Sequence, residues 1–309
     1  MRIAVLGATG HIGTWLVPRL VQRGHDVIGV SRGIRAPYRN SPEWADVRHV
    51  VLDRDALERA GSFGTTIAAL ASDAVIDLIS FTVDSTAQVV DSLRDRVGQF
   101  LHCGTLWVHG VPFSRPYDET APRKPFGEYG VRKAAIEKFL LEEATRGFPA
   151  TVLHPGHITG PGWHPINPAG HLDPRVFDRL ASGDVVTLPN DGSATLQHVH
   201  ADDVAEAFAL AVDHAPDSIG ESFHIAACEP VSMRSYAEQA AQWFGRNANL
   251  AFLPWEEFRT TLTQREAALT YDHMAHSPHA SIDKARRVLG FEPRFTAVEA
   301  VKDAVTGSR

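Results

Sequence analysis

A glycine-rich turn stands between the first apolar run of this chain and its first amphipathic stretch. Residues 2–6 read Arg-Ile-Ala-Val-Leu, a strand pattern, and the turn Gly-Ala-Thr-Gly-His-Ile-Gly occupies residues 7–13. Apolar residues at helical spacing follow, so we expect a strand at Arg2–Leu6 and a helix at Ile12–Arg23. Glycines here permit a tight turn, let the backbone approach a pyrophosphate, and turn the helix N-terminus toward that anion. In this context the spacing predicts a dinucleotide-binding unit.

The rest of the first half repeats this alternation of short apolar runs and amphipathic stretches, which is typical of βαβ units in a parallel sheet. We expect five more strands there, at Asp26–Val30, Val47–Leu52, Ala74–Ile79, Gln99–Cys103 and Ala150–His154. The helices between them are predicted at Asp55–Leu70, Asp84–Val97 and Tyr129–Thr145. The fold class is therefore α/β with a doubly wound parallel sheet.

A stretch rich in Pro, Gly and His at residues 159–174 marks a domain crossing, because this composition stops regular structure. Later strands at Gln197–His200 and Ser222–Ala226, with a helix at Asp202–Asp213, are expected to rejoin the first sheet. We therefore predict a dinucleotide-binding domain of residues 1–160 plus 196–228. A smaller, discontinuous α+β substrate domain would hold residues 161–195 plus 229–309, with helices near Ser232–Phe244, Trp255–Leu269 and Ile282–Leu289.

Composition narrows the class of protein. The 309 residues are 44% apolar and 22% charged, as in an ordinary globular protein. A net charge of -7 without a basic stripe argues against a nucleic-acid partner. We expect no membrane partner, because no apolar run reaches the length of a signal peptide or a membrane span. Cys103 and Cys228 lie far apart and fit a reducing cytoplasm. His198 and His200 share a strand face but lack a third ligand, so no metal is expected.

Tyr129 and Lys133 form the candidate catalytic pair. They are four residues apart on a predicted helix, so both side chains project from one face. A tyrosine hydroxyl titrates near ~10, and an adjacent ammonium favours its ionised form. Thr105, at the carboxyl end of the fifth strand, supplies a hydroxyl that could hold a substrate oxygen near the tyrosine. The set predicts proton transfer beside a hydride carrier.

The end of the second strand favours NADP over NAD. A carboxylate there would bind the adenine ribose of NAD, whereas this chain has Ser31 and Arg32, followed by Arg35. Arg32 could also be a solvated surface charge, so NAD stays open. Asp53, after the third strand, could take the adenine amino group or lie in an exposed loop.

These residues resemble the extended short-chain dehydrogenase/reductase family, also called the epimerase/dehydratase family, over nearly the whole chain. The turn at 7–13, Thr105 and the Tyr129-to-Lys133 spacing match its cofactor turn, its Ser/Thr position and its YxxxK motif. His-Pro-Gly-His-Ile-Thr-Gly-Pro at residues 154–161 resembles the segment that closes over the nicotinamide. Residues 200–205, 281–285 and 289–293 resemble later family motifs. The resemblance implies a Rossmann domain, a bound NAD(P), a small-molecule substrate and a homodimer packed through Asp84–Val97 and Tyr129–Thr145.

Four positions depart from the best-known members. Sugar-nucleotide dehydratases carry Asp-Glu after the Thr, where this chain has Leu106 and Trp107, which argues against dehydration. Many sugar-nucleotide epimerases carry an Arg and an Asn where this chain has His154 and Gly156, which argues against a diphosphate-sugar substrate.

The sequence thus predicts an NAD(P)-dependent oxidoreductase or epimerase acting at a secondary alcohol or ketone carbon of a polar small molecule, with sugar-like substrates among the candidates. The alternative is a non-catalytic dinucleotide-binding redox sensor or nucleic-acid-associated protein that kept the fold. Trp107, His157 and Trp163 could contact the substrate or pack between domains. The expected catalytic residues are Thr105, Tyr129 and Lys133. The expected cofactor-binding residues are Gly7, Thr9, Gly10, His11, Ile12, Gly13, Ser31, Arg32, Asp53, Leu78, Ile79, Ser80, Tyr129, Lys133, His154, Gly156 and His157.

Overall fold

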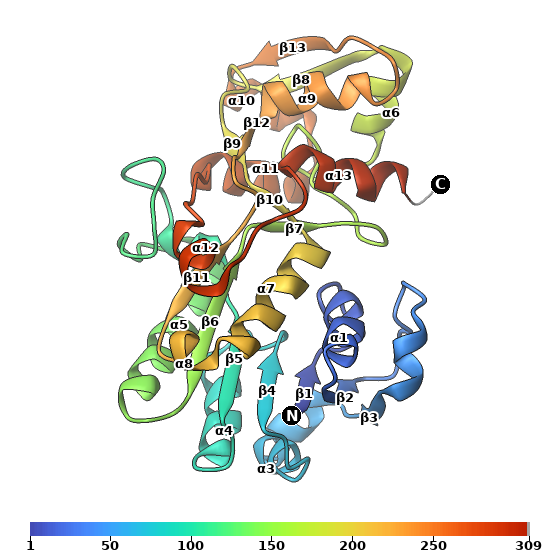
Figure 1. The fold of residues 1–309 in the computed structure, drawn as a ribbon. Helices are drawn as coiled ribbons and strands as arrows, with labels where there is room; N and C mark the ends of the chain where they lie inside the picture. The colour runs from blue at the N-terminus through green and yellow to red at the C-terminus, as the bar shows by residue number, and fades with distance from the viewer. Residues whose placement is uncertain (308–309) are drawn as a thin grey trace.

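The computed structural model describes residues 1–307 and is built on a seven-stranded parallel sheet (Figure 1). The strand order is β11-β6-β5-β4-β1-β2-β3, so the order of winding reverses between β1 and β4. In such sheets ligands bind outside the carboxyl ends of the strands at this reversal. The strands are β1 (Arg2–Leu6), β2 (Asp26–Ser31), β3 (Arg48–Val51), β4 (Ala74–Asp77), β5 (Gln99–Cys103), β6 (Ala150–Pro155) and β11 (Ser222–Ile225).

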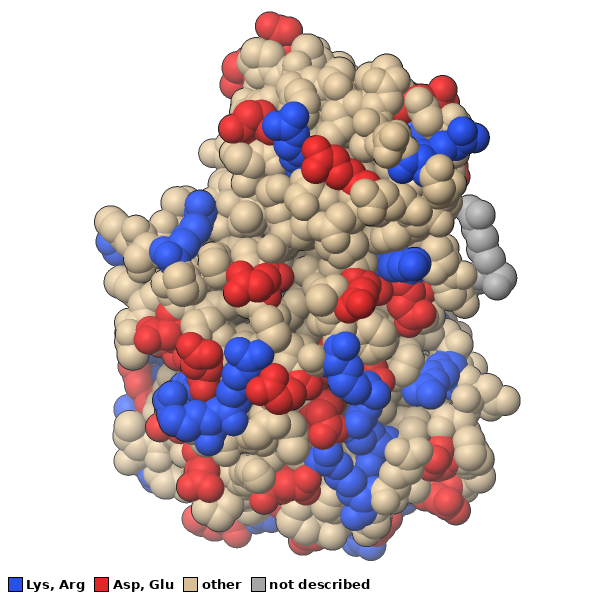
Figure 2. All heavy atoms as spheres, turned by 45° about the horizontal axis from the view of Figure 1, so that its top comes forward, with Lys and Arg blue, Asp and Glu red and all other residues tan. Residues whose placement is uncertain are grey.

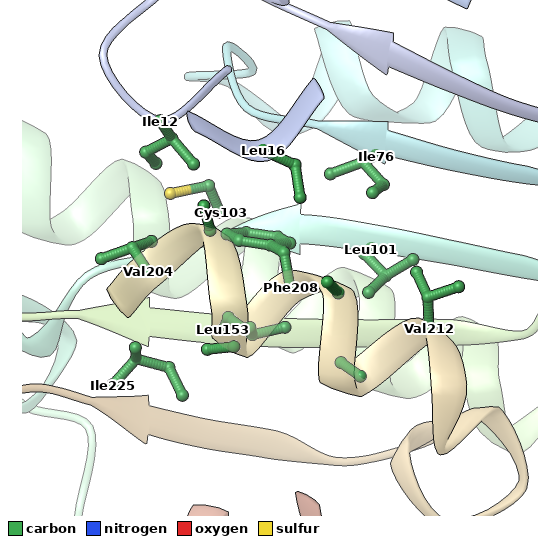
Figure 3. Packing of buried hydrophobic residues seen from close by; sticks show 14 of the residues in the cluster. Ile12, Leu16, Ile76, Leu101, Cys103, Leu153, Val204, Phe208, Val212 and Ile225 are labelled. Carbon is green, nitrogen blue, oxygen red and sulfur yellow. The ribbon is translucent and has the colours of Figure 1, made fainter. Parts of the chain in front are cut away.

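Helices cover both faces of the sheet, so its central strands β4, β5 and β6 are buried along their whole length. On one face α1 and α7 pack against the strands; Figure 3 shows Phe208 of α7 among Leu16, Leu101 and Leu153. On the other face, buried apolar residues join the sheet to α3, α4 and α5. The helices of this part are α1 (Gly13–Gln22), α2 (Arg54–Arg59), α3 (Phe63–Ala68), α4 (Val83–Leu93), α5 (Gly127–Thr145), α7 (Ala201–Asp213) and α8 (Ala215–Ser218), with short 3-10 helices η1 (Pro42–Asp46) and η2 (Leu106–His109).

A second apolar core lies beyond the carboxyl ends of the strands, at the top of Figure 1. Its buried residues include Leu188, Tyr236 and Val301, which come from three distant segments of the chain. Three two-stranded ladders accompany it: β7 with β10, β9 with β12, and β8 with β13. The elements are β7 (His157–Thr159), α6 (Arg175–Ser182), β8 (Val185–Pro189), β9 (Thr195–Leu196), β10 (His198–His200), β12 (Val231–Ser232), α9 (Met233–Gln242), β13 (Asn249–Leu253), α10 (Trp255–Phe258), η3 (Arg259–Thr261), α11 (Gln264–His276), α12 (Asp283–Leu289) and α13 (Ala297–Thr306).

Three sequence expectations need correction. The helix predicted at Asp55–Leu70 is two helices, because Gly61 adopts a left-handed φ of 67° between α2 and α3. The strand predicted at Gln197–His200 does not join the large sheet; β10 pairs in parallel with β7 instead. The helix predicted at Trp255–Leu269 is broken, because Thr263 and Glu266 form a capping box that starts α11 anew.

The surface carries both signs of charge close together. On the face drawn in Figure 2, the basic side chains lie beside acidic ones. Arg19 of α1, for example, pairs with Asp202 and Glu206 of α7. Within residues 1–307, no helix combines the length and the apolar character that a membrane crossing requires.

Candidate active site

The turn after β1 needs glycine for steric reasons. Gly7 has a φ of 92°, in the left-handed region, and its carbonyl accepts a hydrogen bond of 2.9 Å from the Gly10 amide. A Cβ on Gly13 would lie 2.3 Å from the Ala8 carbonyl oxygen and 2.5 Å from that of Gly7. The first turn of α1 can pack this closely on the strand only without side chains. The turn therefore fits a pyrophosphate at a helix N-terminus.

A cavity of about 550 Å³ opens beside this turn. Six of the residues predicted to bind the cofactor line it: Gly7, Thr9, Gly10, Ser31, Arg32 and Ile79. Arg35 and Trp163, which the sequence also singled out, line it as well. The cavity thus runs from the glycine turn to the carboxyl ends of β2 and β4, which is the length of surface that a dinucleotide would follow.

Sequence reasoning missed a buried arginine in the cavity wall. Arg54 donates to both carboxylate oxygens of the fully buried Asp77, at 2.8 and 3.0 Å, and to the hydroxyl of Ser85 at 2.8 Å. Burial opposes the charge, but Asp77 and Glu58 outweigh it and raise the pKa of Arg54. Leu52, Asp55, Phe63 and Phe81 also line the cavity without having been predicted. Leu52 and Phe81 had a sequence signal, because Leu52 ends one predicted strand and Phe81 closely follows another.

Thr105, Tyr129 and Lys133 come together at the carboxyl ends of β4 and β5. Thr105 follows β5 and precedes η2, and its Oγ1 accepts from the Trp107 amide at 3.3 Å. Tyr129 and Lys133 lie one turn apart at the start of α5. The Tyr129 hydroxyl lies within hydrogen-bonding reach of the Thr105 side chain. The three predicted catalytic residues thus share one site.

Lys133 is anchored by the ends of two strands. Its Nζ donates to the carbonyl oxygens of Ser80 and Cys103, both at 2.7 Å, and lies 4.7 Å from the centre of the Phe81 ring. The side chain is only 2% exposed, and burial lowers the pKa of its ammonium. Because Phe81 lines the cavity, the charge of Lys133 lies directly behind one residue of the cavity wall.

Tyr129 keeps 43% of its surface exposed. Desolvation of the hydroxyl raises the pKa of Tyr129 above its ordinary value, and the hydrogen bond with Thr105 opposes this rise. Its ring meets Trp107 edge-on, with 6.0 Å between centres. The tyrosine therefore stays protonated at neutral pH until a positive charge stabilises its ionised form.

Neutral histidines form the wall behind Trp107. The Trp107 ring stacks on His276 with ring centres 4.3 Å apart, and it meets His273 edge-on with 5.3 Å between ring centres. Burial lowers the pKa of both histidines to about 4. Phe126 stacks on the other face of His276, with ring centres 4.0 Å apart. This wall is aromatic and uncharged at neutral pH.

Several predicted cofactor contacts lie away from the cavity. Asp53 uses its carboxylate to cap α2, accepting from the Ala56 amide at 3.0 Å, and it does not line the cavity, whereas Asp55 does. Both ring nitrogens of His154 are already hydrogen-bonded, one to the Thr105 amide and the other to Glu137. His157 is enclosed by His198 and His273. Eight further predicted contacts also do not line the cavity: His11, Ile12, Gly13, Leu78, Ser80, Tyr129, Lys133 and Gly156.

His11 is buried beside the turn and stacks on Trp163, with ring centres 4.7 Å apart. Burial, together with His200, lowers its pKa to about 3, so it is neutral. Through this contact between Trp163 and His11, the loop after β7 packs against the glycine turn. In the part of the chain that the structure describes, no group of three or more His, Cys, Asp or Glu side chains is placed to hold a metal ion.

Comparison with known proteins relates this chain to one enzyme family and to solved structures of the same fold. Residues 3–226 match the model of the NAD dependent epimerase/dehydratase family. A UDP-glucose 4-epimerase of Mycolicibacterium smegmatis is 27% identical, covering 99% of this chain and 97% of that protein. The chloroplast stem-loop binding protein of 41 kDa b from Arabidopsis thaliana is 24% identical, covering 98% and 78%. A Bacillus cereus UDP-glucuronic acid 4-epimerase, solved with UDP-glucuronic acid and NAD, has the same fold, with a TM-score of 0.71, 19% identity and coverage of 99% and 98%.

Proposed function

Because this chain belongs to the NAD dependent epimerase/dehydratase family, we propose that it is an NAD(P)-dependent oxidoreductase or epimerase. It acts at a secondary alcohol or ketone carbon of a polar small molecule, with sugar-like compounds among the candidate substrates. The observation that carries the proposal is the convergence of Thr105, Tyr129 and Lys133 at the carboxyl ends of β4 and β5, where Lys133 contacts Phe81 of the cavity wall. A structural turn alone would not require these three groups to meet.

The chemistry divides between the cofactor and the protein. A bound dinucleotide supplies the hydride acceptor or donor. The Tyr129 hydroxyl gives a proton to the substrate oxygen or takes one from it, and Thr105 holds that oxygen by its own hydroxyl. Lys133 lowers the cost of the ionised tyrosine by its charge, which opposes the desolvation that raises the pKa of Tyr129.

The direct test of this assignment is Tyr129→Phe, which removes the hydroxyl and keeps the ring against Trp107. We expect turnover to fall by about a hundredfold or more, the usual contribution of a positioned acid/base group. A panel of ketones with NADPH or NADH, and UDP-glucose with NAD, supplies the assays. NADPH binding should survive in the variant. Unchanged turnover of a substrate that the wild type accepts would remove the catalytic assignment.

The second strand supports NADP as the preferred cofactor. Ser31, Arg32 and Arg35 line the cavity at the end of β2. A guanidinium there would bind the extra phosphate of NADP, whereas a carboxylate would bind the ribose of NAD. Arg32→Asp should therefore weaken NADPH binding by about tenfold and leave NADH binding equal or tighter, as measured by nucleotide fluorescence. An equal effect on both nucleotides would contradict this preference.

Reductase and epimerase differ in how they treat the cofactor. An epimerase keeps its nucleotide and returns the hydride, while a reductase releases the nucleotide at each turnover. Mass spectrometry of the purified protein separates them. A protein that carries no nucleotide and consumes NADPH in proportion to ketone is a reductase.

A binding protein without catalysis is the second candidate. Its support is the relative named for binding a chloroplast stem-loop. The converged Thr105, Tyr129 and Lys133 favour an enzyme over it. A titration with a labelled RNA stem-loop at two salt concentrations tests it, since specific binding should persist when salt weakens phosphate contacts.

A further inference from the structure

A buried histidine holds the backbone of the proposed substrate-orienting threonine. The amide of Thr105 donates to Nδ1 of His154 at 3.0 Å. Because an amide can only donate, Nδ1 carries no proton, and in the neutral ring the proton is on Nε2. That nitrogen donates to Oε1 of Glu137 at 2.8 Å. The contacts on both sides therefore fix the tautomer and the orientation of the ring.

Glu137 is held in turn by an arginine. Arg123 donates from Nε to Oε2 at 3.0 Å and from Nη2 to Oε1 at 2.6 Å, the two-pronged geometry that suits a carboxylate. Burial would raise the pKa of Glu137, but the hydrogen bond from His154 and the hydrogen bonds and charge of Arg123 outweigh it and hold that pKa below its ordinary range. The carboxylate thus stays charged and keeps its acceptor for His154.

The backbone around Thr105 is shaped for this contact. A Cβ on Gly104 would lie 2.3 Å from Nδ1 of His154, so only glycine lets the imidazole reach the end of β5. Thr105 is extended there, with φ -164° and ψ 149°, before the chain turns into η2. The hydroxyl faces Tyr129 from this position.

The helix that carries the catalytic pair also carries the support. Tyr129, Lys133 and Glu137 follow each other at intervals of four residues along α5, so they share one face. The first two reach the reacting end of the site, and the third reaches beneath it to His154. The same face of α5 therefore positions Tyr129 directly and contacts the support of Thr105 through Glu137.

We propose that His154, Glu137 and Arg123 are positioning residues that set the place of the Thr105 hydroxyl through its backbone amide. The inference rests on the proposed role of Thr105. None of the three touches the substrate in this scheme, which replaces the expected cofactor contact of His154. Their effect should appear in kcat and much less in nucleotide affinity.

Two substitutions of His154 separate its two hydrogen bonds. His154→Asn puts Oδ1 near the place of Nδ1 and keeps an acceptor for the Thr105 amide, while it loses Glu137. His154→Gln reaches Glu137 with its longer amide and loses the acceptor for Thr105. Gln99→Leu is the matched control, because Gln99 is a buried polar residue at the far end of the same β5 strand, bonded to Ala211 and Ser218.

Deuterium exchange of the Thr105 amide and turnover in the ketone and UDP-glucose panel are the measurements. We expect His154→Gln to speed exchange and to lower kcat about tenfold, with NADPH affinity within about twofold of wild type. His154→Asn should recover most of both losses. In a Thr105→Ala background, His154→Gln should lower kcat no further, because both changes act on one group.

The outcomes are distinct. The role of His154 would be merely structural under two conditions. The Asn and Gln variants would show equal exchange and equal kcat, and their losses of kcat would follow their unfolding midpoints and equal the loss in Gln99→Leu. A Thr105→Ala variant with unchanged kcat would instead overturn the role of Thr105 itself. If no compound of the panel turns over, the exchange rates of the two variants still decide whether His154 holds the Thr105 amide.

Discussion

Gly13→Ala is the substitution whose effect the structure defines most sharply. The added Cβ would lie 2.3 Å from the Ala8 carbonyl oxygen, and such atoms are essentially never closer than 3.0 Å. The first turn of α1 must therefore move by at least 0.7 Å away from the strand. Both obstructing atoms are backbone oxygens, so no side chain can rotate to make room.

Overpacking of this kind costs about 1–3 kcal/mol. We expect the free energy of unfolding to fall by that amount in urea titrations followed by circular dichroism. The displaced amides also face the pyrophosphate, so the NADPH dissociation constant should rise by about tenfold or more in fluorescence titrations. The predicted loss of binding exceeds what a change in stability alone would cause, because the measurement is made where the protein is folded.

Gly98→Ala is the control. A Cβ there meets its nearest neighbour, the Asp73 carbonyl oxygen, at an ordinary 3.4 Å. Its free energy of unfolding should stay within about 0.5 kcal/mol of wild type, with NADPH affinity unchanged. If Gly13→Ala matches this control in both measurements, the steric account of the glycine turn is wrong.

Two further predictions concern buried charge. Arg54→Met leaves the Asp77 carboxylate buried without its partner and should destabilise the protein by about 3–5 kcal/mol in urea, whereas Arg259→Met, at an exposed pair with Glu256, should cost less than about 1 kcal/mol. Burial lowers the pKa of His276 to about 4, so its neutral form stabilises the fold above pH ~6.5 and this contribution, up to about 3 kcal/mol, is lost as the pH falls from there toward 4. Unfolding midpoints between pH 7 and 4.5 should decline less in His276→Phe than in wild type, and identical slopes would contradict the reasoning.

The alternating sheet could be predicted from the sequence because each strand and its helix follow local rules. The strands Arg2–Leu6 and Gln99–Cys103 have the bounds that the sequence predicted. The second core could not be predicted in the same way. Its strands Val185–Pro189 and Asn249–Leu253 pair over a long sequence separation, and neither has a clear alternation of apolar residues.

The residues of the candidate site likewise differ in whether the sequence could predict them. Thr105, Tyr129 and Lys133 could be found because their spacing and their strand position are local features. Arg54 could not, because its place in the cavity wall depends on an ion pair with Asp77, which follows it by more than twenty residues and lies on β4. His154 was expected against the cofactor on family resemblance, yet its neighbours in space, Thr105 and Glu137, bind both ring nitrogens.

The last helix has a consequence for the order in which this protein acquires its structure. α13 packs on β10, α9 and β7, and its Val301 is fully buried in the second core beside residues that precede it by more than a hundred positions. That core therefore stays open while the ribosome is still adding residues 297–306. The parallel sheet has all its strands earlier, by Ile225. During synthesis there is therefore a stage at which the part that holds the parallel sheet can fold while apolar side chains of the second core are still exposed to solvent. At that stage a chain of this size is most open to aggregation.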